Sequence, residues 1–384
     1  MRKVVKGYIC FKDKEVPFVI NNYVLELFYN DEATIADFCK EYNRKKNYML
    51  IGKIYEPGGN YRKIECLVEY SLGTICYLTC YTLSNSSLNI EYDRIVFESD
   101  QLDSIFRYKY NYLDLSRKGV NFSSEAKTMH EITFLMDSKN YELKYIIGND
   151  FKMGLLEKFE MIGRTVVDLN DCTICECSKL IRLMHRLLIF MVNPGEVCFT
   201  NIKLLKDNHL VGFVYCNLLK EEHTWANDIK FYEFDVDAFL PRIVQNLALD
   251  INQKITRSVP LGHLIENSIP YKPNKFIEMI NSFEYLFEKL EPEKARKKEY
   301  TLRKEMEEMF NAFPFILSDN IYSSSEVSKE LKELRINIVH GYEYYYEIED
   351  SKNQFCVMKL EWLLRAMSLR LMNFSDEEIN KAIF

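Results

Sequence analysis

The chain has 384 residues and a formal net charge of −7, and 47% of its residues are hydrophobic. This length exceeds what one hydrophobic core usually serves, so we expect two domains. The acidic balance excludes a basic field over the whole molecule, and any contact with RNA must therefore be local.

Three features of the sequence indicate the cellular compartment in which the protein resides. Residues 1–8 carry charges but no apolar run of the length that a signal peptide needs. The most apolar run, residues 180–192, is too short for a membrane span and contains Arg182, His185 and Arg186. Eleven cysteines in such a chain are typical of reduced thiols. We therefore expect a cytoplasmic protein with no membrane partner.

Residues 1–225 predict a β-rich domain. Apolar and polar residues alternate at period two in short segments bounded by turn-forming residues, as in the strands of an antiparallel sheet. Two helical segments are expected among them, at 32–44 and 178–191. We expect the strands at 4–11, 15–21, 49–55, 63–70, 75–81, 88–97, 131–137, 141–147, 196–203 and 210–217.

Residues 226–384 predict an all-helical domain, because alternation at period two gives way to helical periodicity. The connections are short relative to the helices, which favours an antiparallel bundle. The expected fold class is therefore α+β, with a mostly antiparallel β-rich domain before a helical one. We expect helices at 236–254, 275–290, 293–313, 325–340 and 353–373, and a short one from 376 to the end.

The cysteines at 172, 175 and 177 raise the possibility of a metal site. Structural zinc usually needs a second pair of ligands at a defined spacing, and the nearest candidates, His185 and Cys198, fit no such pattern. Cys172 and Cys175 are also expected on opposite faces of a strand. We therefore expect ordinary thiols and no metal here.

Two other segments each leave two interpretations open. The basic run at 294–304 is interspersed with glutamates. It is either a solvated helix with internal ion pairs or a strip that guides an RNA backbone. Residues 342–347 are unusually aromatic. Their tyrosines either pack against the bundle or a dimer partner, or stack on flipped RNA bases.

Residues 330–341 predict the end of an amphipathic helix. The apolar residues of this stretch recur at helical spacing, and Gly341 is the residue type that most often follows a helix. The serines at 323–325 predict the N-cap of the same helix. Arg335 and His340 are five residues apart, which is about 140° around the helix axis. They share one site only if the last turn loosens before Gly341, or if a second copy of the helix faces the first.

The residue types Arg335 and His340 suit phosphodiester cleavage. A histidine exchanges a proton near neutral pH, and a helix C-terminus favours its charged form. An arginine offers a fixed fork of donors that fits phosphate oxygens. The alternative is structural: Arg335 forms a surface ion pair with Glu330 or Glu333, and His340 caps the helix end.

The string Leu-Arg-x-x-Ile-Val-His-Gly at 334–341 resembles the signature of HEPN ribonucleases. It is most similar to the ApeA-like HEPN group, in which a β-rich N-terminal domain precedes the helical one, and the resemblance extends over nearly the whole chain. The family usually has a polar residue, often asparagine, directly after the arginine. Here Ile336 stands in that place and Asn337 follows.

This resemblance implies a HEPN-like helical bundle that dimerises and cleaves RNA without a metal or cofactor. Two copies each of Arg335 and His340 would surround one RNA phosphate, with His340 as general base or acid, Arg335 stabilising charge and Asn337 orienting substrate or water. The resemblance also implies an antiviral role in bacteria, in which RNA cleavage stops the growth of an infected cell. Residues 1–225 would then sense a phage-derived trigger or restrain the bundle.

Two alternatives belong to other functional classes. The first is a catalytically silent HEPN dimer that acts as an interaction or sensing module, with Ile336 as the mark of lost activity. The second is a binding protein that works through its β-rich domain and uses the helical part only to dimerise.

Overall fold

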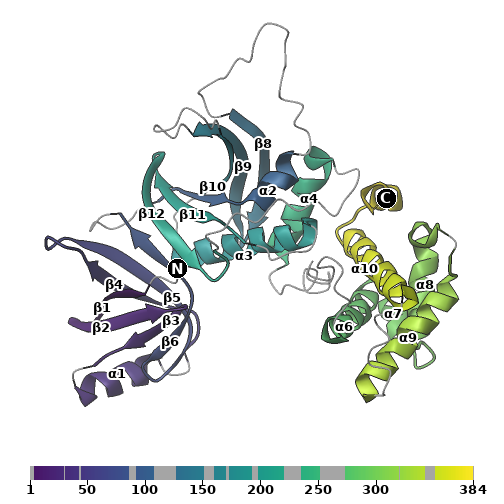
Figure 1. Cartoon of the computed structure of the whole chain (residues 1–384), viewed down its shortest axis with the longest axis horizontal. Coiled ribbons are helices and arrows are strands. Elements are labelled where there is room, and N and C mark those ends of the chain that lie inside the picture. The colour runs from purple at the N-terminus through teal and green to yellow at the C-terminus, as the bar shows by residue number, and fades with distance from the viewer. Residues whose placement is uncertain are drawn as a thin grey trace, which may run out of the picture. The chain divides into compact units, whose positions relative to one another are not determined.

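The computed structural model describes residues 4–29, 31–42, 45–85, 92–107, 127–150, 160–169, 173–192, 198–219, 235–250, 273–319, 321–341 and 351–383. The chain divides into two compact units (Figure 1). The first comprises Met1–Thr133, Lys139–Met184 and Cys198–Trp225. The second comprises Phe134–Ser138, His185–Val197 and Ala226–Phe384. No helix in the described part of the chain is both long and apolar enough to span a membrane.

The first unit contains an antiparallel β-barrel. Its strands run in the order β3-β2-β1-β4-β5-β6, and the pairing of β3 with β6 closes the ring. The helix α1 (Glu32–Tyr42) packs against the barrel through Phe38, whose ring centroid lies 5.3 Å from that of Phe11. The six strands are β1 (Val5–Phe11), β2 (Lys14–Asn21), β3 (Val24–Leu27), β4 (Tyr48–Tyr55), β5 (Tyr61–Leu72) and β6 (Ile75–Ser84).

Six more strands extend the sheet from β6 in the order β12-β11-β7-β10-β9-β8. They are β7 (Arg94–Glu98), β8 (Lys127–Met136), β9 (Lys139–Asp150), β10 (Glu160–Asp168), β11 (Asn201–Lys206) and β12 (His209–Cys216). Two helices lie between these strands in the sequence: α2 (Asp100–Arg107) follows β7, and α3 (Ile174–Met191) connects β10 to β11.

Four hairpins in this sheet have two-residue turns in which both central residues have positive φ. This is the type I′ geometry, whose twist matches that of the flanking strands and which Asn and Asp tolerate best. The turns lie at 12–13, 22–23, 137–138 and 207–208. Each contains at least one Asp or Asn, so local turn chemistry sets the register of these pairs.

The second unit is mainly helical. Within it α8 packs against α9, and α10 packs against α6, α9 and α11 (Figure 1). Buried side chains line almost the whole length of α10. The helices are α4 (Val236–Leu249), α6 (Pro273–Leu290), α7 (Pro292–Ala295), α8 (Leu302–Ala312), the 3₁₀ helix η2 (Pro314–Leu317), α9 (Ser324–His340), α10 (Ser351–Leu371) and α11 (Asp376–Ile383).

Charged side chains inside α10 are paired. Lys359 is only 2% exposed, and its Nζ donates to the carbonyl oxygen of Ile316 at 2.8 Å and to the Asp319 carboxylate at 2.6 Å. Glu361 and Arg365 form a buried ion pair one turn apart. An unpaired buried charge would cost several kcal/mol, so the contacts of Lys359 hold α10 against η2 and the α8–α9 connection, while the pair of Glu361 and Arg365 lies within α10 itself.

The prediction of an α+β fold is confirmed in outline, as a β-barrel region followed by a helical region. The sequence analysis missed β3, β10, α2 and η2. The predicted helix at 293–313 is wrong: α7 ends at Ala295 and α8 begins at Leu302. Six residues, 296–301, lie between the two helices, and the first four of them are all charged, so they offer no apolar side chain for a buried helix face.

The predicted strand around Cys172 and Cys175 is also wrong in its described part. Cys175 lies in the first turn of α3, where it is exposed, and Cys177 is buried. Cys172 lies outside the described residues. Among the residues that the structure describes, no group of three or more His, Cys, Asp or Glu side chains could hold a metal ion.

Candidate functional site

The helix α9 carries the three predicted site residues and has well-defined ends. At its start Ser323 Oγ accepts from the backbone N–H of Glu326, whose carboxylate accepts from the Ser323 N–H in return. This capping box confirms the predicted N-cap. At its end Gly341 adopts the left-handed conformation with φ 64°, as predicted, and its N–H bonds to the carbonyl oxygens of Asn337 and Ile338.

Burial falls off along α9. Val327, Ser328, Leu331 and Leu334 are buried and anchor the first three turns. No later residue of the helix is buried, although three of the six are aliphatic. Arg335, Ile336, Asn337 and Ile338 are half-buried, His340 is exposed, and Val339 is 57% exposed. The last turn of α9 therefore presents apolar side chains beside all three candidate site residues.

Arg335 has a weak carboxylate partner. Its Nη2 lies 4.0 Å from Oε1 of Glu284 on α6, and the two side chains are 39% and 43% exposed. Such an exposed pair typically contributes about 0–1 kcal/mol. The predicted ion pair with Glu330 or Glu333 is not found, because Glu330 pairs with Lys352 at 2.5 Å and Glu333 with Lys329 at 3.9 Å.

A second carboxylate, that of Glu305 on α8, lies near this pair. Partial burial, and secondly the charge of Glu284, raise the pKa of the Glu305 carboxyl above its usual range. Three charged side chains from α6, α8 and α9 therefore meet on one side of the helical unit. Two of them are acidic, so a phosphate that binds Arg335 must displace or screen Glu284.

Arg335 and His340 diverge within one chain. The chain is α-helical through His340, so the last turn does not loosen before Gly341. Five residues of regular α-helix separate the two positions by about 140° around the axis and about 7.5 Å along it. Asn337, three residues before His340, lies on the same side of the helix as His340. The structure thus brings Asn337 to His340 and leaves Arg335 facing elsewhere.

The sequence analysis missed Glu284 and Glu305. Both lie on polar faces of helices that were expected only as helices, and only the packing of α6 and α8 beside α9 reveals their role. In the basic run, Lys294 forms ion pairs with Glu291 and Glu308, which favours the interpretation of a solvated helix at this residue. The aromatic segment at 342–347 lies outside the described residues.

In comparisons with known proteins, no family model, no curated protein and no solved structure matches this chain.

The end of α9 is testable through Gly341. Replacement by Ala should lower the free energy of unfolding by about 1–2 kcal/mol, because an L side chain is strained in the left-handed region although nothing obstructs a Cβ there. Gly341→Asn is the matched control. Its free energy of unfolding should fall clearly less, since Asn adopts the left-handed conformation routinely. Urea unfolding measures both. Equal losses for the two variants would contradict the assigned helix end.

The raised pKa of Glu305 predicts a pH-dependent effect. A carboxyl whose pKa is raised by folding stabilises the folded state below its ordinary pKa, and this contribution is lost as the pH rises through the folded value. Glu305→Gln should therefore be more stable than wild type at pH 7, with the difference shrinking towards pH 4. Glu307→Gln on the same helix controls for the loss of one negative charge. The assignment is wrong if both variants raise the free energy of unfolding equally, or if the increase for Glu305→Gln does not change with pH.

Proposed function

We propose that the chain is a metal-independent endoribonuclease of the HEPN type, similar to ApeA-like proteins, whose active site forms between the helical units of two copies. The observation that carries this proposal is the end of α9. It keeps helical geometry to His340, so that Arg335 and His340 diverge, while Val339 at 57% exposure stays uncovered.

A second copy of α9 that faces the first would bring an arginine and a histidine together and would also cover Val339. In a two-fold dimer the same surface patch of each protomer contacts its counterpart on the other, so the last turns of the two helices face each other. Ile336 and Val339, which are three residues apart and lie on the same side of the helix, then lose contact with water, which is favourable at roughly 25 cal/mol per Å² of apolar surface. The same arrangement turns Arg335 of one protomer towards His340 of its partner.

The chemistry follows from the two side chains. The ribose 2′-hydroxyl attacks the neighbouring phosphorus, and the bond to the 5′-oxygen of the next nucleotide breaks, which leaves a 2′,3′-cyclic phosphate and a 5′-hydroxyl. A neutral His340 takes the proton from the 2′-hydroxyl, and a protonated His340 of the partner gives one to the leaving oxygen. Such general acid–base catalysis is worth about 10²–10⁴-fold in rate.

Arg335 acts on the phosphate. Its guanidinium donates to the phosphorane oxygens, where negative charge develops in the transition state. The exposed pair with Glu284 is weak enough to be exchanged for a phosphate oxygen. Asn337, on the side of the helix that holds His340, orients the substrate or the imidazole.

The biological role that fits this activity is defence against phage. RNA cleavage in the cytoplasm arrests the growth of an infected cell, so the nuclease must stay silent until it is triggered. In this proposal residues 1–225 sense a phage-derived trigger or restrain the helical unit, and residues 226–384 form the HEPN-like nuclease.

Single substitutions test the site. Arg335→Ala and His340→Ala should each lower the rate of RNA cleavage by the purified protein at least about 10²-fold without changing its fold. Arg335→Lys should stay well below wild type, because an ammonium lacks the planar fork. Lys329→Ala, an exposed position on the same helix, is the control and should leave the rate unchanged.

RNA that carries a 2′-deoxyribose at the cleavage site should resist the wild-type protein. Cleavage that survives both Arg335→Ala and His340→Ala would contradict the proposal. A dimer that cleaves no RNA under any condition would instead favour the catalytically silent interaction module.

A further inference from the structure

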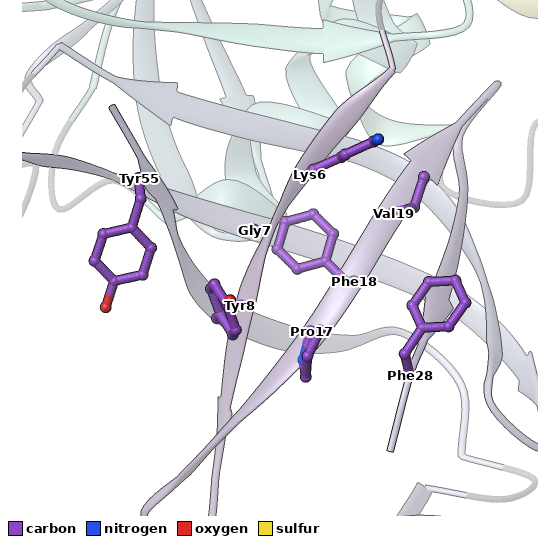
Figure 2. A pocket seen from close by; sticks show the side chains of 8 residues that line it. All are labelled: Lys6, Gly7, Tyr8, Pro17, Phe18, Val19, Phe28 and Tyr55. Carbon is purple, nitrogen blue, oxygen red and sulfur yellow. The ribbon is translucent and has the colours of Figure 1, made fainter. Parts of the chain in front are cut away.

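A pocket of about 280 Å³ lies on the barrel of the first unit (Figure 2). It is formed by β1, β2, the start of the segment after β3 and the end of β4. Each of these four places supplies one aromatic side chain, and in Figure 2 Tyr8 and Phe28 flank Pro17 while Tyr55 lies beyond Tyr8. The lining residues are Lys6, Gly7, Tyr8, Pro17, Phe18, Val19, Phe28 and Tyr55.

Three exposed aromatic rings in one pocket are unusual on a barrel whose core is already filled. Tyr8 is 37%, Phe28 45% and Tyr55 48% exposed, so none of them is needed to fill the interior. Phe28 is held at the rim because its N–H donates to the Pro17 carbonyl oxygen at 2.8 Å. Clustered apolar exposure of this kind marks a binding surface.

Two of the rings, those of Tyr8 and Tyr55, are also held in defined positions. Tyr8 and Tyr55 meet edge to face with centroids 5.5 Å apart. The Tyr55 hydroxyl donates to the Glu15 carboxylate at 3.2 Å, and Glu15 in turn accepts from Lys53 at 3.1 Å. Because this network fixes Tyr55 and Tyr55 contacts Tyr8, stacking of a ligand on Tyr8 costs little conformational entropy of that ring.

The pocket has one uncompensated positive charge. Lys6 is exposed and has no ion-pair partner among the residues that the structure describes. Lys53 on β4 and Arg62 on β5, by contrast, are paired, Lys53 with Glu15 and Arg62 with Glu56 at 2.7 Å. A ligand that suits the pocket therefore combines a flat, stackable ring with a nearby anion.

We propose that this pocket binds one unstacked base of a single-stranded RNA between Tyr8 and Phe28, with the adjoining phosphate on Lys6. Aromatic faces beside a cation are the combination by which proteins hold single strands. A proline-rich peptide fits less well, because the Tyr55 hydroxyl that would donate to its carbonyl groups is engaged by Glu15. The choice of RNA over DNA rests on the proposed ribonuclease function, whereas the binding of a single strand does not.

Binding is measured with the full chain and a fluorescent, fully 2′-O-methylated oligonucleotide of roughly 12 nucleotides. This probe cannot be cleaved by 2′-hydroxyl attack, so its binding is independent of the proposed activity. Tyr8→Ala and Phe28→Ala should each weaken binding by about 5-fold to 100-fold, as expected for one lost stacking contact. Tyr70→Ala, an exposed tyrosine elsewhere on the barrel, is the matched control and should bind as wild type.

The charge contact has its own readout. Lys6→Gln should lower the slope of log affinity against log salt by about 0.7, the value for one phosphate contact on a single strand. Lys46→Gln, another exposed lysine of the first unit, should leave the slope unchanged.

Wild-type protein that does not bind the oligonucleotide, or variants at Tyr8 and Phe28 that bind it as tightly as wild type, would overturn the inference. A peptide whose binding depends on these two residues while the oligonucleotide does not bind would also overturn it. If RNA cleavage proves independent of Arg335 and His340 but binding still depends on the pocket, the proposed function fails and this inference stands.

Discussion

The regular geometry of α9 is the constraint on which the functional account depends. The helix holds its form to His340 because Gly341, at φ 64°, ends it cleanly. At 3.6 residues per turn, Arg335 and His340 then point about 140° apart. Within one chain the two side chains lie on different sides of the helix, whereas the proposed dimer would bring one arginine and one histidine to the same phosphate. Dimerisation is therefore part of the proposed chemistry.

Electrostatics around Arg335 sets how readily the site accepts an anion. Glu284 lies 4.0 Å from the guanidinium, and partial burial, and secondly the charge of Glu284, raise the pKa of the neighbouring Glu305 carboxyl. The two carboxylates lower the local potential in a chain that is already acidic, with a net charge of −7. In the proposed nuclease, binding of RNA through Arg335 alone would therefore be weak, and the proposed base-binding pocket on the barrel would supply affinity that the proposed catalytic site lacks.

Local signals predicted much of the secondary structure but not its long-range consequences. The capping serine and Gly341 marked the ends of α9 because cap geometry depends on a few neighbouring residues. The short strand β3 was missed, since its four residues carry little periodicity, and with it the closure of the barrel through its pairing with β6. The partner Glu284 could not be predicted, because its place beside Arg335 depends on how α6 packs, and periodicity says nothing of that.

The most direct test of the account compares two purified heterodimers, each with one intact Arg335 and one intact His340. In the first, an Arg335→Ala chain is paired with a His340→Ala chain. In the second, a wild-type chain is paired with an Arg335→Ala/His340→Ala chain, and two affinity tags isolate each heterodimer. The account predicts clearly faster RNA cleavage by the first, because its intact arginine and histidine come from opposite chains. An inactive first heterodimer beside an active second one would contradict it.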